Sequence, residues 1–409
     1  MKKLIVILTS VFLLVFMSAC GNGNSGSKPA ENSNSPAPAA SESSKASAQP
    51  AAAAPIKIGG LFAASGGASS LGKPEMDTVK MMVEQANANG GIGGRQLELV
   101  AYDTKGDQNE AVLDMKKLIE NDKVAAVIGG TTSGECMALI PIAEKAKVPF
   151  IALGASKAIN IPAKPYVFKT PQGDDIVAPR VVKYLKDHNL TKVAWLNVDN
   201  SFGSSGKEEY DKAAKAAGIE TVISESFEAT VNDAKPMLTR VKNANPQAIV
   251  VWGTTQESAV VTKNIRELKI DVPILESHGI ANAQFIELAG KAAEGVIFPA
   301  GRLLVADKLP DDNKQKKILV DYAKNFQAKF NYPASTFGGH AWDAFEILTN
   351  AIKTAGDDPQ KIRDTLENNT KDIVGTGGIF NYTKDDHNGL NADALAMIKI
   401  EMGKWVLEE

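Results

Sequence analysis

The sequence predicts an α/β protein made of two doubly wound parallel-sheet lobes. Three observations predict this class. From Ile56 onward, short runs rich in β-branched and aromatic residues alternate with amphipathic stretches of helical period, a pattern typical of parallel sheets covered on both faces. The alternation starts again after residue 170. The chain from Ile56 on is also long for a single hydrophobic core, so two domains are expected.

The pattern assigns the elements of each lobe in turn. In the first lobe, strands are expected over residues 56–62, 97–102, 124–128 and 149–153, and helices over 78–88, 109–120 and 133–147. In the second lobe, strands are expected over residues 193–198, 219–227, 248–252 and 273–276, and helices over 177–187, 204–217, 236–243 and 257–268. The longest helical region, 314–354, follows, and a hairpin over 395–406 ends the pattern.

The first residues have the pattern of an export signal. Two lysines precede an apolar run from Leu4 to Phe16, which is shorter than the ~20 residues that a membrane-spanning helix needs. Ser18 and Ala19 come directly before Cys20, an arrangement similar to the lipobox of bacterial lipoproteins. We therefore expect a signal peptide over residues 1–19 and acyl chains on Cys20 that hold the protein to a membrane outside the cytoplasm. The alternative is a secreted protein with a chance cysteine.

A low-complexity segment follows Cys20. Residues 21–55 contain no aromatic residue and no Leu, Ile or Val, so they cannot bury enough apolar surface to offset the entropy of ordering. Residues 20–55 are therefore predicted to be a lipidated cysteine and a disordered tether. Such a tether suits a protein that docks repeatedly on a membrane partner.

Composition excludes several function classes. The formal charge of -3 argues against nucleic-acid binding, which needs a basic surface. If Cys20 carries lipid, Cys136 is left alone and no disulfide framework forms. The four histidines lack metal-ligand spacing, and the run Gly130–Gly134 lacks the central serine of a hydrolase elbow. We therefore expect no metal, no cofactor and no catalytic residue.

The candidate site lies where two predicted strands end. The strand over 124–128 runs into Gly129–Ser133, where a helix begins, and unpaired N–H groups at a helix start bind carboxylates. Ser133 either donates a hydroxyl to such a ligand or only caps its own helix. The next strand end, Gly154–Ser156, offers the same materials.

Four motifs in order carry a resemblance to a known family. They are Asn87–Arg95, Val127–Ser133, Pro149–Ser156 and Asp199–Gly203. In this order and spacing, from about Ile56 to Leu407, the chain resembles the leucine/isoleucine/valine-binding family, the solute-binding proteins of branched-chain amino acid ABC transporters. The resemblance implies the type I periplasmic binding protein fold. In that fold a three-crossing hinge joins the two lobes, and a ligand binds in the cleft between them.

The resemblance also implies domain boundaries. Chain crossings fall near Thr170-Pro171, Pro299-Ala300 and Thr376-Gly377. Lobe 1 is then residues 56–171 plus 300–376, and lobe 2 is residues 172–299 plus 377–409. The helices over 314–354 would return to lobe 1.

The resemblance assigns ligand contacts in both lobes. They are Ser133, Gly154, Ala155 and Ser156 in lobe 1, and Phe202, Trp252, Thr255 and His278 in lobe 2. Lobe 1 would hold the carboxylate of the ligand. In lobe 2 the chain departs from the family, because His278 stands where an acidic residue pairs with the substrate ammonium. Glu276, Asp199 or Glu257 could supply that charge if one of them faces the cleft, and His278 could also be only a loop residue beside it.

These features together predict a function. We expect a monomeric, lipid-anchored solute-binding protein that delivers a branched-chain or other aliphatic amino acid to an ABC permease in the membrane. His278 and Phe202 instead favour an aromatic or aliphatic carboxylate without an ammonium. A sensor subunit that reports its ligand to a signalling partner is the alternative of another class.

Overall fold

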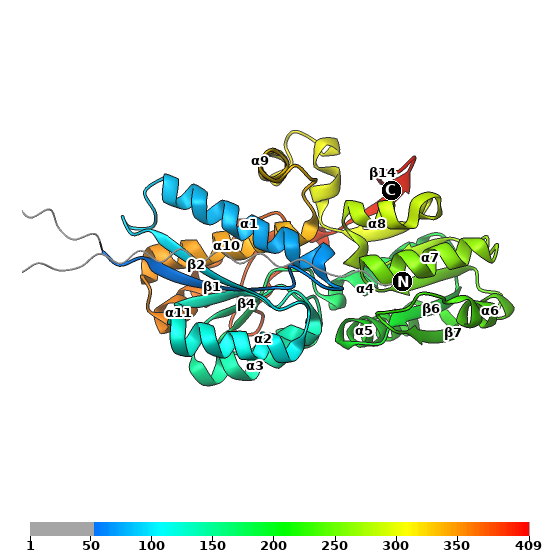
Figure 1. Cartoon of the computed structure of the whole chain (residues 1–409). Helices are drawn as coiled ribbons and strands as arrows, with labels where there is room; N and C mark the ends of the chain where they lie inside the picture. The colour runs from blue at the N-terminus through cyan, green and yellow to red at the C-terminus, as the bar shows by residue number, and fades with distance from the viewer. Residues whose placement is uncertain (1–52, 409) are drawn as a thin grey trace, which may run out of the picture. The chain divides into compact units, whose positions relative to one another are not determined.

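The computed structural model of the protein describes residues 53–408. The predicted signal peptide, Cys20 and the tether as far as residue 52 lie outside these residues and stay predictions. Figure 1 shows two groups of strands, each flanked by helices. Within residues 53–408, no helix combines the length and the hydrophobicity that crossing a membrane requires.

The first sheet has five parallel strands in the order β2-β1-β3-β4-β5. The strands are β1 (Ile56–Phe62), β2 (Leu97–Asp103), β3 (Ala126–Gly129), β4 (Phe150–Ala152) and β5 (Val167–Lys169). Helices α2 (Gln108–Lys117) and α3 (Ser133–Ala146) cover one face, and α1 (Ser69–Ala88), α10 (Thr336–Ala355) and α11 (Pro359–Asn369) cover the other (Figure 1). The period-2 alternation of β1 explains this, because Ile58 and Phe62 pack toward α1 and α10 while Leu61 packs toward α2 and α3.

The second sheet has seven strands in the order β14-β13-β10-β9-β8-β6-β7. The strands are β6 (Lys192–Val198), β7 (Glu220–Phe227), β8 (Ala248–Trp252), β9 (Ile274–Glu276), β10 (Ile297–Ala300), β13 (Ala396–Glu401) and β14 (Lys404–Leu407). The first five along the chain are parallel, and the β13–β14 hairpin joins β10 in antiparallel register. The helices of this lobe are α4 (Asp174–Asp187), α5 (Ser201–Ala217), α6 (Lys235–Asn243), α7 (Thr255–Glu267) and α8 (Ala283–Ala289).

The remaining elements are helix α9, a small strand pair and several short helical turns. Helix α9 (Lys316–Phe330) forms a satellite core with Met81 of α1, and α10 packs directly on α1, so the region 314–354 lies against the first lobe. Strands β11 (Ile373–Val374) and β12 (Ile379–Phe380) form a small antiparallel pair. A π-helical turn covers Leu118–Asp122, and 3₁₀ turns cover Lys157–Ile159, His278–Ile280, Gly290–Ala293, Arg302–Lys308 and Ala392–Ala394.

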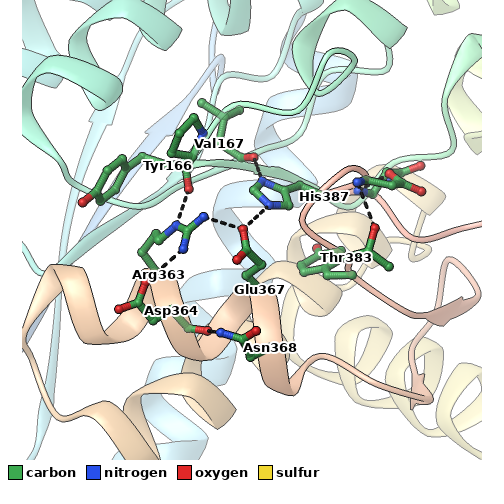
Figure 2. A network of polar contacts seen from close by, with 12 residues as sticks. Tyr166, Val167, Arg363, Asp364, Glu367, Asn368, Thr383 and His387 are labelled. Carbon is green, nitrogen blue, oxygen red and sulfur yellow. Dashed lines mark hydrogen bonds and ion pairs between the residues drawn. The ribbon is translucent and has the colours of Figure 1, made fainter.

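The segment after the expected last crossing at Thr376-Gly377 packs with the first lobe. Phe380 and Tyr382 belong to the same core as β1, α1 and α10. Figure 2 shows His387 held between the carbonyl of Val167 in β5, at 2.8 Å, and the carboxylate of Glu367 in α11, at 3.2 Å. The chain joins the second sheet only at β13. Residues from Phe380 to about Leu390 therefore pack with the first lobe, and we propose that the last crossing follows them.

The predicted fold class, two doubly wound parallel-sheet lobes, is confirmed, with differences at particular elements. Helix α1 begins at Ser69 rather than at residue 78, because Gly72 and Pro74 obscured the apolar period of its first turns. Strand β10 was missed because Pro299 argues against a strand, and β5 because it has only three residues.

Candidate ligand-binding site

A cavity of about 360 Å³ lies where strands of both sheets end. Its first-lobe wall includes Thr131–Gly134 after β3 and Ala155 after β4. Its second-lobe wall includes Phe202 at the start of α5, Glu257 in the first turn of α7 and His278 after β9. The carboxyl ends of parallel strands are where open α/β sheets bind ligands, and a volume of this size suits a small molecule.

The cap of α3 is Thr132 and not Ser133. The Glu135 N–H donates to Thr132 Oγ1 at 3.2 Å, and Glu135 Oε2 accepts from the Thr132 N–H at 2.8 Å, which makes a capping box. Because Thr132 is the N-cap, the alternative prediction that Ser133 only caps its own helix is wrong. The first N–H groups of α3 have no partner inside the helix and lie at its positive end.

Ser133 connects the two strand-end loops of the first lobe. Its Oγ accepts a hydrogen bond from the Ser156 N–H at 3.1 Å, so its own O–H remains available as a donor. Gly154 lies directly behind, and a Cβ added there would come within 3.0 Å of the Ser133 Cα. Ser133 and Ala155 line the cavity, whereas Gly154 and Ser156 are not among its lining residues.

A buried lysine forms a hydrogen bond with the loop that follows β4. Lys169, at the end of β5, donates from Nζ to the Ala155 carbonyl at 3.0 Å and has no exposed surface. Burial lowers the pKa of Lys169, and the nearby carboxyl groups of Asp175, Asp174 and Asp386 act in the opposite direction. This bond helps to hold the loop in place, and it uses one lone pair of the Ala155 oxygen.

Aromatic side chains form part of the second-lobe wall. Phe202 and His278 line the cavity, with ring centroids 5.5 Å apart in an edge-to-face arrangement. Trp252 is fully buried behind them, at 5.9 Å from Phe202 and 6.1 Å from His278. Trp252 thus positions the other two rings and is not itself a lining residue.

Thr255 is turned away from the cavity. It is fully buried, and its Oγ1 accepts a hydrogen bond from Asn282 Nδ2 at 2.5 Å. The neighbouring Thr254 and Glu257 line the cavity instead. The structure therefore brings Ser133, Ala155, Phe202 and His278 to one cavity; Gly154, Ser156, Trp252 and Thr255 are not lining residues.

Of the three acidic residues that could pair with an ammonium, Glu276, Asp199 and Glu257, only Glu257 lines the cavity. Its Oε1 accepts from the Thr254 N–H at 2.7 Å and from Thr254 Oγ1 at 2.8 Å, and no group among residues 53–408 donates to Oε2. Glu276, the last residue of β9, is fully buried, accepts from Thr262 at 2.8 Å, and has a pKa that burial raises well above its usual range. Asp199 is exposed and outside the cavity.

Two histidines share the cavity wall. His278 comes from the second lobe, and His340 from the first turns of α10 against the first lobe. Burial lowers the pKa of each imidazole to about 3, and the positive charge of Lys169 acts in the same direction on both. Both rings are therefore neutral at neutral pH.

Sequence reasoning missed His340 and the neighbouring Phe337, which also lines the cavity. Helix α10 lies far along the chain from the strand-end loops, so the alternating pattern gave no reason to place them together. The resemblance pointed to His278 but not to His340, and unpaired ring nitrogens cannot be read from a sequence. Among residues 53–408, no group of three or more His, Cys, Asp and Glu side chains could hold a metal ion.

Comparison with known sequences identifies relatives over most of the chain. It is 28% identical over 294 residues to the leucine-, isoleucine-, valine-, threonine- and alanine-binding protein of Pseudomonas aeruginosa, which covers 71% of this chain and 76% of that protein. It is 25% identical over 327 residues to the Leu/Ile/Val-binding protein of Escherichia coli K12, which covers 79% and 86%.

Solved structures agree with these relatives. An extracellular ligand-binding receptor from Rhodopseudomonas palustris HaA2 superposes with a TM-score of 0.82 at 27% identity, over 87% of this chain and 99% of that one. The branched-chain amino acid transporter substrate-binding protein LivJ of Streptococcus pneumoniae, in complex with isoleucine, superposes with a TM-score of 0.76 at 28% identity, over 86% and 97%. The model of the periplasmic binding protein family matches residues 55–404, and the chain belongs to this family.

Proposed function

We propose that the protein is the lipid-anchored solute-binding subunit of an ABC importer, which takes a small α-amino acid into the cavity between its lobes and presents it to a membrane permease. The names of its relatives support an amino-acid ligand, since they include binding proteins for leucine, isoleucine, valine, threonine and alanine. These amino acids are the starting candidates for the ligand of this chain.

One observation carries the choice of an α-amino acid. The start of α3 and Ser133, which suit a carboxylate, line the same cavity as the free Oε2 of Glu257, which suits an ammonium. A zwitterion satisfies both sides. A carboxylate without an ammonium would leave the Glu257 charge buried and unpaired beside it, which is unfavourable by several kcal/mol. In this proposal, Glu257 supplies the negative charge that the resembling family has at the position of His278.

Binding is proposed to close the two lobes on the solute. Ser133 belongs to the first lobe and Glu257 to the second, so a solute that contacts both stabilises the closed arrangement. The solute is released unchanged, in keeping with a family of solute-binding proteins.

Calorimetric titration tests this proposal. Leucine, isoleucine, valine, threonine and alanine are each compared with the 2-keto or 2-hydroxy acid of the same side chain. At least one amino acid is expected to bind, and to bind at least about 100-fold more tightly than its deaminated partner. Equal or tighter binding of the deaminated acids would instead support the carboxylate ligand that His278 and Phe202 favour.

A further inference from the structure

Two cavity-lining histidines have ring nitrogens without hydrogen-bond partners. In His278, both Nδ1 and Nε2 are buried and unpartnered among residues 53–408, and in His340 the same holds for Nδ1. The two residues are 5% and 4% exposed. Buried polar atoms are nearly always paired with protein, water or a ligand, so three such nitrogens at one cavity indicate that something polar binds there.

The other two histidines provide a contrast within the same chain. Both ring nitrogens of His387 are hydrogen-bonded, to the Val167 carbonyl and to Glu367 (Figure 2). His188 is exposed, and its Nδ1 lies 2.8 Å from the Tyr184 carbonyl oxygen. Among the four histidines, buried ring nitrogens without a partner therefore occur in the two that line the cavity.

We propose that His278 and His340 form a polar subsite that binds an uncharged hydrogen-bonding group, a hydroxyl or a carboxamide, on the side chain of the solute. This inference rests on the proposed function and narrows it, because the preferred solute becomes a polar amino acid rather than a purely aliphatic one. His278 belongs to the second lobe and His340 packs with the first, so a group that bonds to both contributes to closure.

The chemistry of neutral imidazole determines the class of this group. A neutral ring offers one N–H donor and one acceptor, as a hydroxyl or carboxamide does in return. Burial keeps both rings uncharged, and the ammonium of Lys169 nearby opposes their protonation further. A methyl-bearing side chain offers these nitrogens no hydrogen bond and leaves them buried and unpaired, so it should bind about 10- to 100-fold more weakly than a polar side chain of the same shape.

Edge-to-face packing fixes the orientation of His278. Its ring lies at 69° to Phe202 and at 70° to Trp252, and neither of its nitrogens has a hydrogen-bond partner among residues 53–408. Such rigid placement of a donor and an acceptor favours recognition of one solute group over another.

The test compares isosteric pairs of amino acids by calorimetric titration of the wild-type protein. Threonine and valine differ by a hydroxyl in place of a methyl group, and asparagine and leucine differ by a carboxamide in place of an isopropyl group. In at least one pair, the polar member is expected to bind at least about 10-fold more tightly. Equal or tighter binding of both aliphatic members would overturn the subsite while leaving the proposed function in place. If no amino acid binds, the proposed function fails and the subsite with it.

Variants then assign the preference to the two rings. His278→Leu and His340→Leu are each expected to remove the polar preference, and His278→Asn to restore part of it. His188→Leu, a change outside the cavity, is the control and should leave the preference intact. A preference that survives in both cavity variants would overturn the proposal, and because the wild-type comparison needs no variant, a variant that fails to fold does not prevent the test.

Discussion

The hydroxyl oxygen of Ser133 accepts a hydrogen bond from the backbone N–H of Ser156 at 3.1 Å. This bond joins the loops that follow β3 and β4, the two strand ends that form the first-lobe wall of the cavity. It also leaves the O–H of Ser133 free to donate toward a solute. The relationship explains why these loops act as one unit and provides the first prediction.

Ser133→Ala should weaken binding of the preferred amino acid by about 10- to 100-fold, because one donor to the solute and the bond between the loops are both lost. Titration calorimetry measures this effect. Ser335→Ala is the matched control, since Ser335 caps α10 outside the cavity by accepting from the Gly338 N–H at 3.4 Å. The control should lower the free energy of unfolding by about 1 kcal/mol and leave affinity unchanged. Unchanged affinity in Ser133→Ala would show that the carboxylate binds elsewhere.

Glu257→Gln should reduce affinity for the amino acid by at least about 100-fold and should not weaken binding of the matched keto acid. The amide oxygen of glutamine can still accept from Thr254, so the cap of α7 is retained. Glu276→Gln is the control: burial raises the pKa of this carboxyl well above its usual range, and Glu276 lies outside the cavity. If both variants lose the same affinity, Glu257 has no special role in holding an ammonium.

The histidines predict a pH dependence of stability. Their pKa in the folded protein is about 3, below the ordinary value of about 6.5 in an unfolded chain. The unfolded state therefore takes up more protons between these values, so the stability that the rings contribute is fully present above about pH 6.5 and is lost as the pH falls toward 3. The slope is about 1.4 kcal/mol per pH unit for each ring.

The difference between wild type and His278→Leu isolates this effect, because other buried groups act in the opposite direction; burial raises the pKa of Asp343 to about 7, for example. Chemical denaturation at several pH values from 7 to 4 should show that the advantage of wild type shrinks, or its disadvantage grows, as the pH falls. A difference that stays constant with pH would mean that His278 is not held in its neutral form.

Asp343 of α10 holds the segment where the last crossing was expected. Its carboxylate accepts from the Thr376 N–H at 2.5 Å and from the Gly377 N–H at 2.7 Å. Asp343→Asn places an NH₂ group against one of these donors and should lower the free energy of unfolding by about 1–3 kcal/mol. Asp385→Asn, in an exposed loop, should have no measurable effect in the same denaturation experiment. Equal stability of the two variants would contradict this role of Asp343.

Cys20→Ala should release the protein from the membrane fraction, because the acyl chains that we propose at this residue provide the anchor. Cell fractionation with metabolic labelling by a fatty-acid analogue measures both effects. The control is Cys136→Ala, which changes a fully buried thiol. Retention of the label after Cys20→Ala would contradict the predicted lipid site.

The alternating pattern was sufficient for most strands and helices, because burial on both faces gives parallel strands a continuous apolar run. It could not place residues 380–390, whose packing against the first lobe depends on contacts of Tyr382 and His387 with β5, distant in sequence. The assignment of residues after 376 to the second lobe was therefore based on the family resemblance and not on the pattern of residues.

The site was predictable in part for a similar reason. Ser133 and Ala155 follow strand ends and could be located from the sequence. Thr255 and Glu257 could not be distinguished, because the side-chain directions at the start of α7 are set by its capping box and by Asn282. Motif matching assigned Thr255, and the geometry instead brings Glu257 to the cavity.

A crystal structure of the protein with its bound amino acid tests the central claim most directly. The account predicts the solute carboxylate within hydrogen-bonding distance of Ser133 Oγ and the first N–H groups of α3, and the ammonium within 2.7–3.2 Å of Glu257 Oε2. A solute bound outside this cavity, or bound in it with the ammonium away from Glu257, would contradict the account.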